Sequence, residues 1–129
     1  MSIYEKIIAG EEPGWIIWED EFYAAILSIE PYNEGHTLVL PKKNVGDDIF
    51  ELEQEVYDGL MRAARTVGRM LKKAFGSERL IVWVRGYEIS HVHVHLIPSD
   101  LAVDLVSTKR KLLAPADLEP VYQRIMSGI

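Results

Sequence analysis

The chain has 129 residues, the size of one domain around a single core, and its 48% hydrophobic and 26% charged residues exclude a disordered or fibrous protein. The net charge of −6 at pH 7 argues against nucleic acid or an anionic membrane surface as the main partner. Cysteine is absent, which excludes a disulfide framework and thiolate chemistry.

The same composition bears on the cellular location. The first residues lack the basic and apolar regions of a signal peptide, and no apolar run approaches the ~20 residues that a membrane-spanning helix needs. A chain without cysteine also suits a reducing compartment. We therefore expect a soluble, cytoplasmic protein without a membrane partner.

The first expected element is a short helix. Ser2 and Glu5, three residues apart, have the pattern of a capping box at a helix start. Gly10 is expected to end the helix.

Three strands follow, and hydrophobic alternation places them at residues 15–18, 22–29 and 36–40. The acidic turn Glu19–Glu21 joins the first two strands into a hairpin. Turn-forming residues at 31–35 predict a loop, and Pro41 closes the third strand.

The longest element is a helix that we expect from Asp48 to Phe75, where the hydrophobic period changes to about 3.6 residues. Asp48 and Glu51 have the spacing of a helix cap. Lys72 and Lys73 lie in the last turn, where positive charge complements the helix dipole, and Gly76 ends the helix.

The second half of the chain predicts two more strands and a final helix. A β-branched run at 80–84 and the stretch 91–97 are expected to pair across the turn 85–88. Beyond Pro98 the pattern weakens, and a final helix is expected within 115–126, beginning near Pro120. The sum is an α+β fold: an antiparallel sheet of about five strands with a long helix and a short amino-terminal helix, the helices on one face.

Residues 91–97, His-Val-His-Val-His-Leu-Ile, contain three of the four histidines of the chain. In an extended strand, His91, His93 and His95 share one face, while the apolar residues between them share the other. Three imidazoles in a row add no apolar surface to a core, so this face favours a chemical role.

Two chemistries fit such a row, metal binding and nucleophilic catalysis. Zinc–nitrogen bonds of about 2.1 Å require converging ligands, yet His91 and His95 are roughly 13 Å apart on an extended strand. A metal would therefore need a further ligand, such as His36. In the second chemistry, a neutral imidazole attacks an electrophile while its neighbours orient it and protonate the leaving group, and the middle residue, His93, is the natural nucleophile.

The run 91–97 resembles the signature of the histidine triad (HIT) family. Residues 35–42, Gly-His-Thr-Leu-Val-Leu-Pro-Lys, resemble that family's second block, and residues 7–13 with 18–21 resemble its amino-terminal segment. The order and spacing of all three agree over residues 2–98. The resemblance implies one HIT-like domain over 1–129, with a core at 2–98 and a variable tail at 99–129. It also implies a homodimer in which two sheets join into one.

The resemblance further implies a nucleotide hydrolase or nucleotidyl transferase that cleaves at an α-phosphate through a covalent nucleotidyl-histidine intermediate. Carried over by position, His93 is the nucleophile, His91 and His36 belong to the supporting hydrogen-bond network, and His95 lies beside the phosphate and the leaving group. Dinucleoside polyphosphates, nucleoside phosphoramidates and adenylated amines are the implied small-molecule substrates. No metal or other cofactor is expected for the chemistry.

The implied nucleotide contacts are Ser28, Ile29, Tyr87 and Glu88. Ser28 replaces the family's acidic ribose contact, and Tyr87 and Glu88 replace a glutamine and a small hydroxyl residue next to the phosphate. A carboxylate ~5 Å from a phosphate charge costs on the order of 3 kcal/mol at an effective dielectric near 20. These differences leave open an alternative, a catalytically weak nucleotide-binding or sensor module of the same fold. A metal-binding protein is the third reading.

Overall fold

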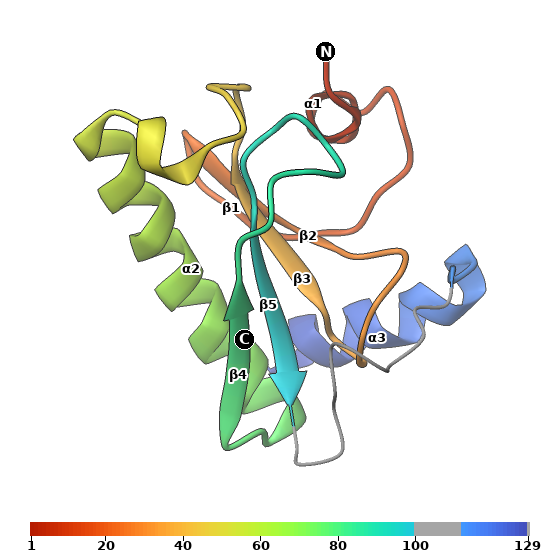
Figure 1. Ribbon diagram of the computed structural model, residues 1–129. Coiled ribbons are helices and arrows are strands. Elements are labelled where there is room, and N and C mark those ends of the chain that lie inside the picture. The colour runs from red at the N-terminus through yellow and green to blue at the C-terminus, as the bar shows by residue number, and fades with distance from the viewer. Residues whose placement is uncertain (100–111, 129) are drawn as a thin grey trace.

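The computed structural model describes residues 1–99 and 112–128. Their helices and strands are shown in Figure 1. The helical elements are α1 (Ile3–Ile8), the short 3₁₀ helix η1 (Ile49–Glu51), α2 (Gln54–Phe75) and α3 (Pro115–Ser127). The strands are β1 (Ile16–Glu19), β2 (Tyr23–Leu27), β3 (Thr37–Pro41), β4 (Arg79–Trp83) and β5 (Val94–Ser99).

The five strands form one antiparallel sheet in the order β1-β2-β3-β5-β4. This confirms the α+β class and the expected pairing of the two late strands. In the register, Leu38 of β3 lies opposite both Ile26 of β2 and His95 of β5. Because directly opposed residues share a face of the sheet, His95 is on the same face as these two apolar side chains.

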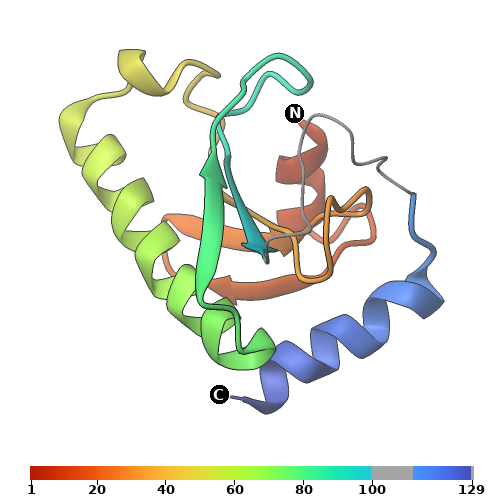
Figure 2. The same ribbon diagram turned by 60° about the horizontal axis from the view of Figure 1, so that its bottom comes forward.

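Both faces of the sheet are covered, which corrects the expectation of helices on one face. The larger core lies between the sheet and helices α2 and α3, and it contains Val39, Leu60 and Leu118. A smaller core lies on the opposite face under α1, where Tyr4 packs with Leu38. Figure 2 shows α1 on the other side of the sheet from α2 and α3. His95 therefore belongs to the α1 face.

The capping box of α1 is confirmed. The Ser2 hydroxyl accepts a hydrogen bond from the Glu5 amide at 3.1 Å, and the Ser2 amide donates to the Glu5 carboxylate at 3.0 Å. These two bonds satisfy backbone donors that a helix start leaves without an intrahelical partner. They also fix the position of Ser2 over the sheet.

Two helix starts were predicted wrongly. Asp48 caps η1, accepting from the Phe50 amide at 2.9 Å, and α2 begins only at Gln54 because Leu52 is extended. The final helix begins at Pro115 and carries Pro120 inside it. Proline at the first helical position needs no amide partner, which makes Pro115 the better start. The tail beyond Ser99 is described only from residue 112, so residues 100–111 lie outside the described part.

The strand that was expected to carry all three histidines of the row begins later. Only His95 lies within β5, and His91 and His93 precede it. They are in an irregular segment that enters the sheet after the turn at 85–90. Within the described residues, no helix is both long and apolar enough to cross a membrane.

Candidate active site

The four histidines gather on the α1 face of the sheet, and all are buried. The rings of His93 and His95 are 4.9 Å apart between centroids, and those of His36 and His95 are 5.1 Å apart. His91 joins the group through Tyr4, whose ring packs edge-on against both His91 and His93, at 5.6 and 5.3 Å. The structure thus brings together all four histidines that the sequence singled out.

The tautomer of His93 is set by its own backbone. Its Nδ1 lies 2.7 Å from the carbonyl oxygen of His91, a group that can only accept a hydrogen bond. Nδ1 therefore carries the proton, and in the neutral ring Nε2 carries the lone pair. This is the state that a nucleophilic imidazole requires.

His36 and His95 form a directed pair. The Tyr32 amide donates to Nδ1 of His36 at 3.0 Å, so the neutral ring of His36 carries its proton on Nε2. That Nε2 lies 2.9 Å from Nδ1 of His95 and donates to it. The remaining proton of a neutral His95 is then on Nε2. One backbone amide thereby determines which nitrogen of His95 is the donor.

His91 links the row to α1. Its Nε2 donates to the Pro41 carbonyl at 2.6 Å, so Nδ1 accepts from the Ser2 hydroxyl, also at 2.6 Å. Burial lowers the pKa of His91 below its usual 6.5, although the Pro41 carbonyl and the charge of Glu5 act in the opposite direction. His91 is thus held neutral as a structural link whose carbonyl orients His93.

The lowered pKa of His91 predicts a pH-dependent stability. Unfolded His91 binds a proton below pH 6.5, whereas the folded side chain resists protonation, so the unfolded state binds more protons and stability falls as the pH falls. Urea unfolding between pH 7.5 and 5.5 should show a steeper loss in the wild type than in His91→Asn. Equal slopes would contradict the direction. Glu5, whose pKa is lowered by hydrogen bonds from the Ser2 and Asn44 amides, stays ionised throughout.

A pocket of about 370 Å³ lies next to the row, between α1 and the end of β2. Its wall is mostly apolar, and it also contains three of the four implied nucleotide contacts, Ser28, Ile29 and Glu88. Tyr4 lines this pocket as well and connects it to His93. The shape and lining suit a flat apolar group with a few polar atoms.

Two of the implied nucleotide contacts, Tyr87 and Glu88, lie in the turn after β4, and only Glu88 lines the pocket. The Glu88 carboxylate forms an ion pair with Arg85 at 3.0 Å, so part of its negative charge is balanced. Arg85 in turn stacks over the Trp83 ring at 4.8 Å. Tyr87 is 92% exposed and is not part of the pocket wall.

Sequence reasoning missed several residues of the site. Ser2 was identified only as a helix cap, and Tyr4, Tyr32 and Trp83 were not singled out. Ser2 contacts a residue 89 positions away, and no local pattern signals such a contact. The Trp83 and Tyr32 rings pack near His95 and His36, at 6.0 and 5.8 Å. Within residues 1–99 and 112–128, no three His, Asp or Glu side chains are arranged to hold a metal ion.

This fold and this histidine cluster define a HIT domain. The family model described as "HIT domain" matches residues 9–101, and the chain belongs to the histidine triad family. An uncharacterized HIT-like protein of Methanocaldococcus jannaschii is 38% identical over 101 residues, which are 76% of this chain and 78% of that protein. The adenylylsulfatase HINT3 of Arabidopsis thaliana is 30% identical over 101 residues, 74% of this chain and 51% of that protein.

Solved structures show the same relationship. A hypothetical histidine triad nucleotide-binding protein of Sulfolobus tokodaii matches with a TM-score of 0.84 and 29% identity, over 98% of this chain and 90% of that chain. A HIT-like protein of Bartonella henselae, solved with an unknown ligand, matches with a TM-score of 0.83 and 26% identity, over 99% and 96% of the two chains. The proteins similar to this chain thus include a hypothetical histidine triad nucleotide-binding protein and an adenylylsulfatase.

Proposed function

We propose that this protein is a nucleotide hydrolase or nucleotidyl transferase that cleaves at an α-phosphate through a covalent nucleotidyl-histidine intermediate on His93. The observation that carries the proposal is the 2.7 Å bond from Nδ1 of His93 to the His91 carbonyl, which leaves the lone pair on Nε2. Family membership and the nucleotide-binding relative support the substrate class.

In the first step, the Nε2 lone pair of His93 forms a bond to the α-phosphorus while the bond from phosphorus to the leaving group breaks. The leaving group takes the proton from Nε2 of His95. Loss of this proton leaves a negative charge on the His95 ring, which the hydrogen bond that His36 donates to its Nδ1 and the positive charge of the adjacent nucleotidylated His93 ring stabilise until a proton returns in the second step. The Nδ1 bond of His93 likewise supports the positive charge on the nucleotidylated ring.

In the second step, a water oxygen attacks the phosphorus, the bond to His93 breaks, and the proton of the water returns to Nε2 of His95. One difficult displacement is thereby divided into two easier ones. Replacing water with another acceptor gives transfer in place of hydrolysis. His93 is 3% exposed, so we expect substrate binding to be accompanied by local movement of the groups that cover it.

The nucleoside is proposed to occupy the 370 Å³ pocket, with its base on the apolar wall and its ribose near Ser28 and Ile29. The Ser28 hydroxyl accepts from the Glu30 amide at 3.2 Å, and a hydroxyl that accepts one bond can still donate its own proton to a ribose oxygen. Pairing with Arg85 reduces the repulsion between Glu88 and a phosphate. Tyr87 would contact a nucleotide only if the turn at 85–90 closes over it.

Incubation with adenosine 5′-phosphoramidate in the presence of a chelator tests the proposal. We expect release of adenosine monophosphate and an acid-labile nucleotide adduct on His93, detected by mass spectrometry. Binding without turnover would support instead the nucleotide-binding module, which the exposed Tyr87 and the replacement at Ser28 favour. Loss of binding with chelator would support a metal site.

A cytoplasmic location is proposed from the lack of cysteine.

We also propose a homodimer in which the β4 strands of two chains meet. β4 is an edge strand of the sheet, and Val82 on it is 57% exposed. A groove of about 490 Å³ beside it is lined by Met61, Ala64 and Gly68 of α2, and by the basic side chains of Arg65, Arg69 and Lys72 on the same helix. An unpaired strand edge with exposed apolar side chains is a typical site for pairing with a second chain.

Sedimentation velocity measures this prediction. The wild type should sediment as a dimer of 29 kDa, from two chains of 14.7 kDa, and Val82→Lys should sediment as a monomer because a charge would be buried at the edge. Val45→Lys, at a residue that is 43% exposed outside β4, is the matched control and should remain dimeric. A monomeric wild type would contradict the proposal.

A further inference from the structure

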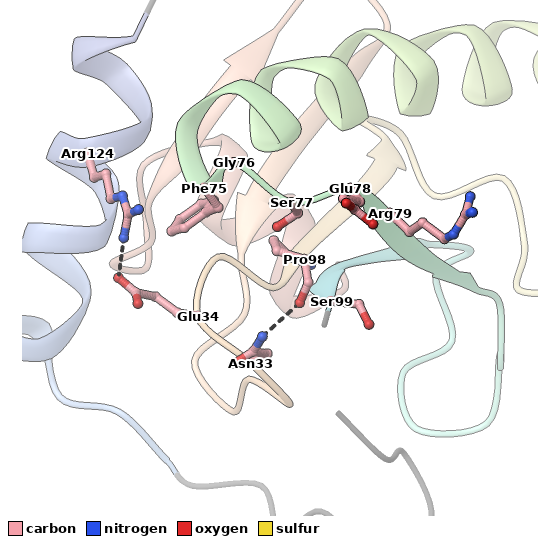
Figure 3. Close-up of a pocket in the computed structure, with 10 residues that line it drawn as sticks. All are labelled: Asn33, Glu34, Phe75, Gly76, Ser77, Glu78, Arg79, Pro98, Ser99 and Arg124. Carbon is pink, nitrogen blue, oxygen red and sulfur yellow. Dashed lines mark hydrogen bonds and ion pairs between the residues drawn. The ribbon is translucent and has the colours of Figure 1, made fainter. Parts of the chain in front are cut away.

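A side chain outside the histidine cluster connects the two elements that carry His36 and His95. Nδ2 of Asn33 donates to the Pro98 carbonyl at 2.8 Å, and Figure 3 shows this bond between the loop before β3 and the end of β5. The Asn33 carbonyl also accepts from the His36 amide at 3.1 Å. Asn33 therefore holds the loop both to the strand of His95 and to His36 itself.

The position of this loop determines the direction of the bond between the two histidines. The backbone of His36 is already fixed, because its carbonyl accepts from the Ser28 amide at 2.9 Å. The Tyr32 amide, which donates to Nδ1 of His36, places the proton of the neutral ring on Nε2. Tyr32 immediately precedes Asn33, so a shift of Asn33 moves the Tyr32 amide relative to Nδ1 of His36.

The consequence for His95 follows from the donor and acceptor properties of imidazole. Without the Tyr32 amide on Nδ1, the neutral His36 ring can carry its proton on either nitrogen. When the proton is on Nδ1, Nε2 becomes an acceptor, and Nδ1 of His95 must donate to it. His95 then has a lone pair, not a proton, on the nitrogen that faces the leaving group.

We propose that Asn33 is a positioning residue: its amide bond to the Pro98 carbonyl keeps the Tyr32 amide on His36 and so keeps His95 in the tautomer that donates to the leaving group. The proposal deepens the proposed function and rests on it for the role of His95. The structural part, which concerns only the tautomers, holds for the free protein.

The surroundings of this bond make it testable by substitution. It borders a cavity of about 530 Å³ at the end of β5, which Figure 3 shows with Asn33 at its wall. The cavity has room for water, which can satisfy the Pro98 carbonyl when the amide is removed. Asn33→Ala should therefore fold, but a water molecule does not tie the loop to the strand.

The tautomers are measured directly from the ring ¹⁵N chemical shifts and two-bond ¹⁵N–¹H couplings of the ligand-free protein at pH 8. In the wild type, His36 and His95 should each show a single form with the proton on Nε2. In Asn33→Ala and in the isosteric Asn33→Asp, which replaces the donor with a second acceptor, both rings should show mixed forms. Glu34→Gln is the matched control, because Glu34 lies in the same loop and forms only an exposed ion pair with Arg124 at 3.6 Å.

The activity arm uses adenosine 5′-phosphoramidate. Asn33→Ala should lower kcat about 10- to 100-fold, the scale of a small misplacement of a reacting group, with KM changed less than about threefold. Glu34→Gln should retain wild-type kcat. A nitrophenyl ester of adenosine monophosphate has a leaving group that needs no proton, so Asn33→Ala should release the first equivalent of nitrophenol from it at close to the wild-type rate, measured as a pre-steady-state burst.

Unchanged ¹⁵N shifts in both Asn33 variants, or a wild-type His36 with its proton on Nδ1, would overturn the proposal. Unfolding of both variants would also overturn it, because the proposal assigns to Asn33 one bond beside a cavity with room for water and no part of the core. If the wild type turns over neither substrate, the proposed function fails, and the shifts still decide whether Asn33 sets the tautomers.

Discussion

His93→Ala is expected to abolish turnover of adenosine 5′-phosphoramidate and to leave no nucleotide adduct on the protein. The lost imidazole is the group proposed to form the bond to phosphorus, because the His91 carbonyl holds the proton of His93 on Nδ1 and leaves the lone pair on Nε2. Removal of a nucleophile commonly lowers kcat by about 10⁴-fold or more. Steady-state rates and mass spectrometry of the quenched reaction measure the two effects.

His95→Ala provides the control that separates nucleophile from proton donor. This variant should lose most activity toward the phosphoramidate, whose amine leaves with a proton. With the nitrophenyl ester, whose leaving group needs no proton, it should still release a first equivalent of nitrophenol, although hydrolysis of the adduct slows because His95 is the proposed acceptor of the water proton. His93→Ala should be inactive toward both. Nucleotide binding and circular dichroism confirm that the variants fold. Turnover of either compound by His93→Ala would end the assignment of the nucleophile.

Gly35→Ala is expected to be the most destabilising small substitution near the site. Gly35 has φ +87°, in the region that other residues rarely adopt, and a methyl group there would lie 2.5 Å from Cε2 of Phe75. The backbone strain costs about 1–3 kcal/mol, and the overlap with the packed ring adds about 1–3 kcal/mol. Urea unfolding monitored by tryptophan fluorescence measures the sum.

Gly10→Ala is the matched control for the backbone part alone. Gly10 has a similar φ of +79°, but a methyl group there would meet nothing within 4 Å. Gly35→Ala should therefore lower the unfolding free energy by about 1–3 kcal/mol more than Gly10→Ala. Adding Phe75→Leu to Gly35→Ala should recover part of that difference, because the two residues touch and their effects are not additive. Equal losses for the two glycines would contradict the packing account.

The sequence predicted those parts of the fold that depend on local patterns. The capping box at Ser2, the positions of the strands and the stop at Gly76 concern neighbours within a few positions, and each is confirmed. The start of α2 was predicted too early because Asp48 does cap a helical turn, but that turn is a separate 3₁₀ helix. A local signal for a cap does not say how far the helix continues.

The sequence predicted which histidines form the candidate site, but it did not predict how they are hydrogen-bonded. The row of histidines was visible in the sequence, and the structure places His36 beside it. The directions of the hydrogen bonds were not visible, because they depend on the Tyr32 amide and the Pro41 carbonyl, which are backbone groups of other elements. Contacts between residues as far apart as Ser2 and His91 are properties of the folded chain, and no spacing within one segment encodes them.

The two faces of the sheet have different roles: one carries most of the hydrophobic core, and the other carries the candidate site. Among the described residues, most of the apolar burial is on the face of α2, whereas the histidines and the pocket share the face of α1 with a core of four buried apolar residues. A library at the pocket positions Ile7 and Ile89, which are partly buried at the margin of that small core, would thus vary substrate choice without disturbing the layer that keeps the molecule folded. Laboratory evolution of new nucleoside preferences should succeed more often on this side of the sheet than on the other.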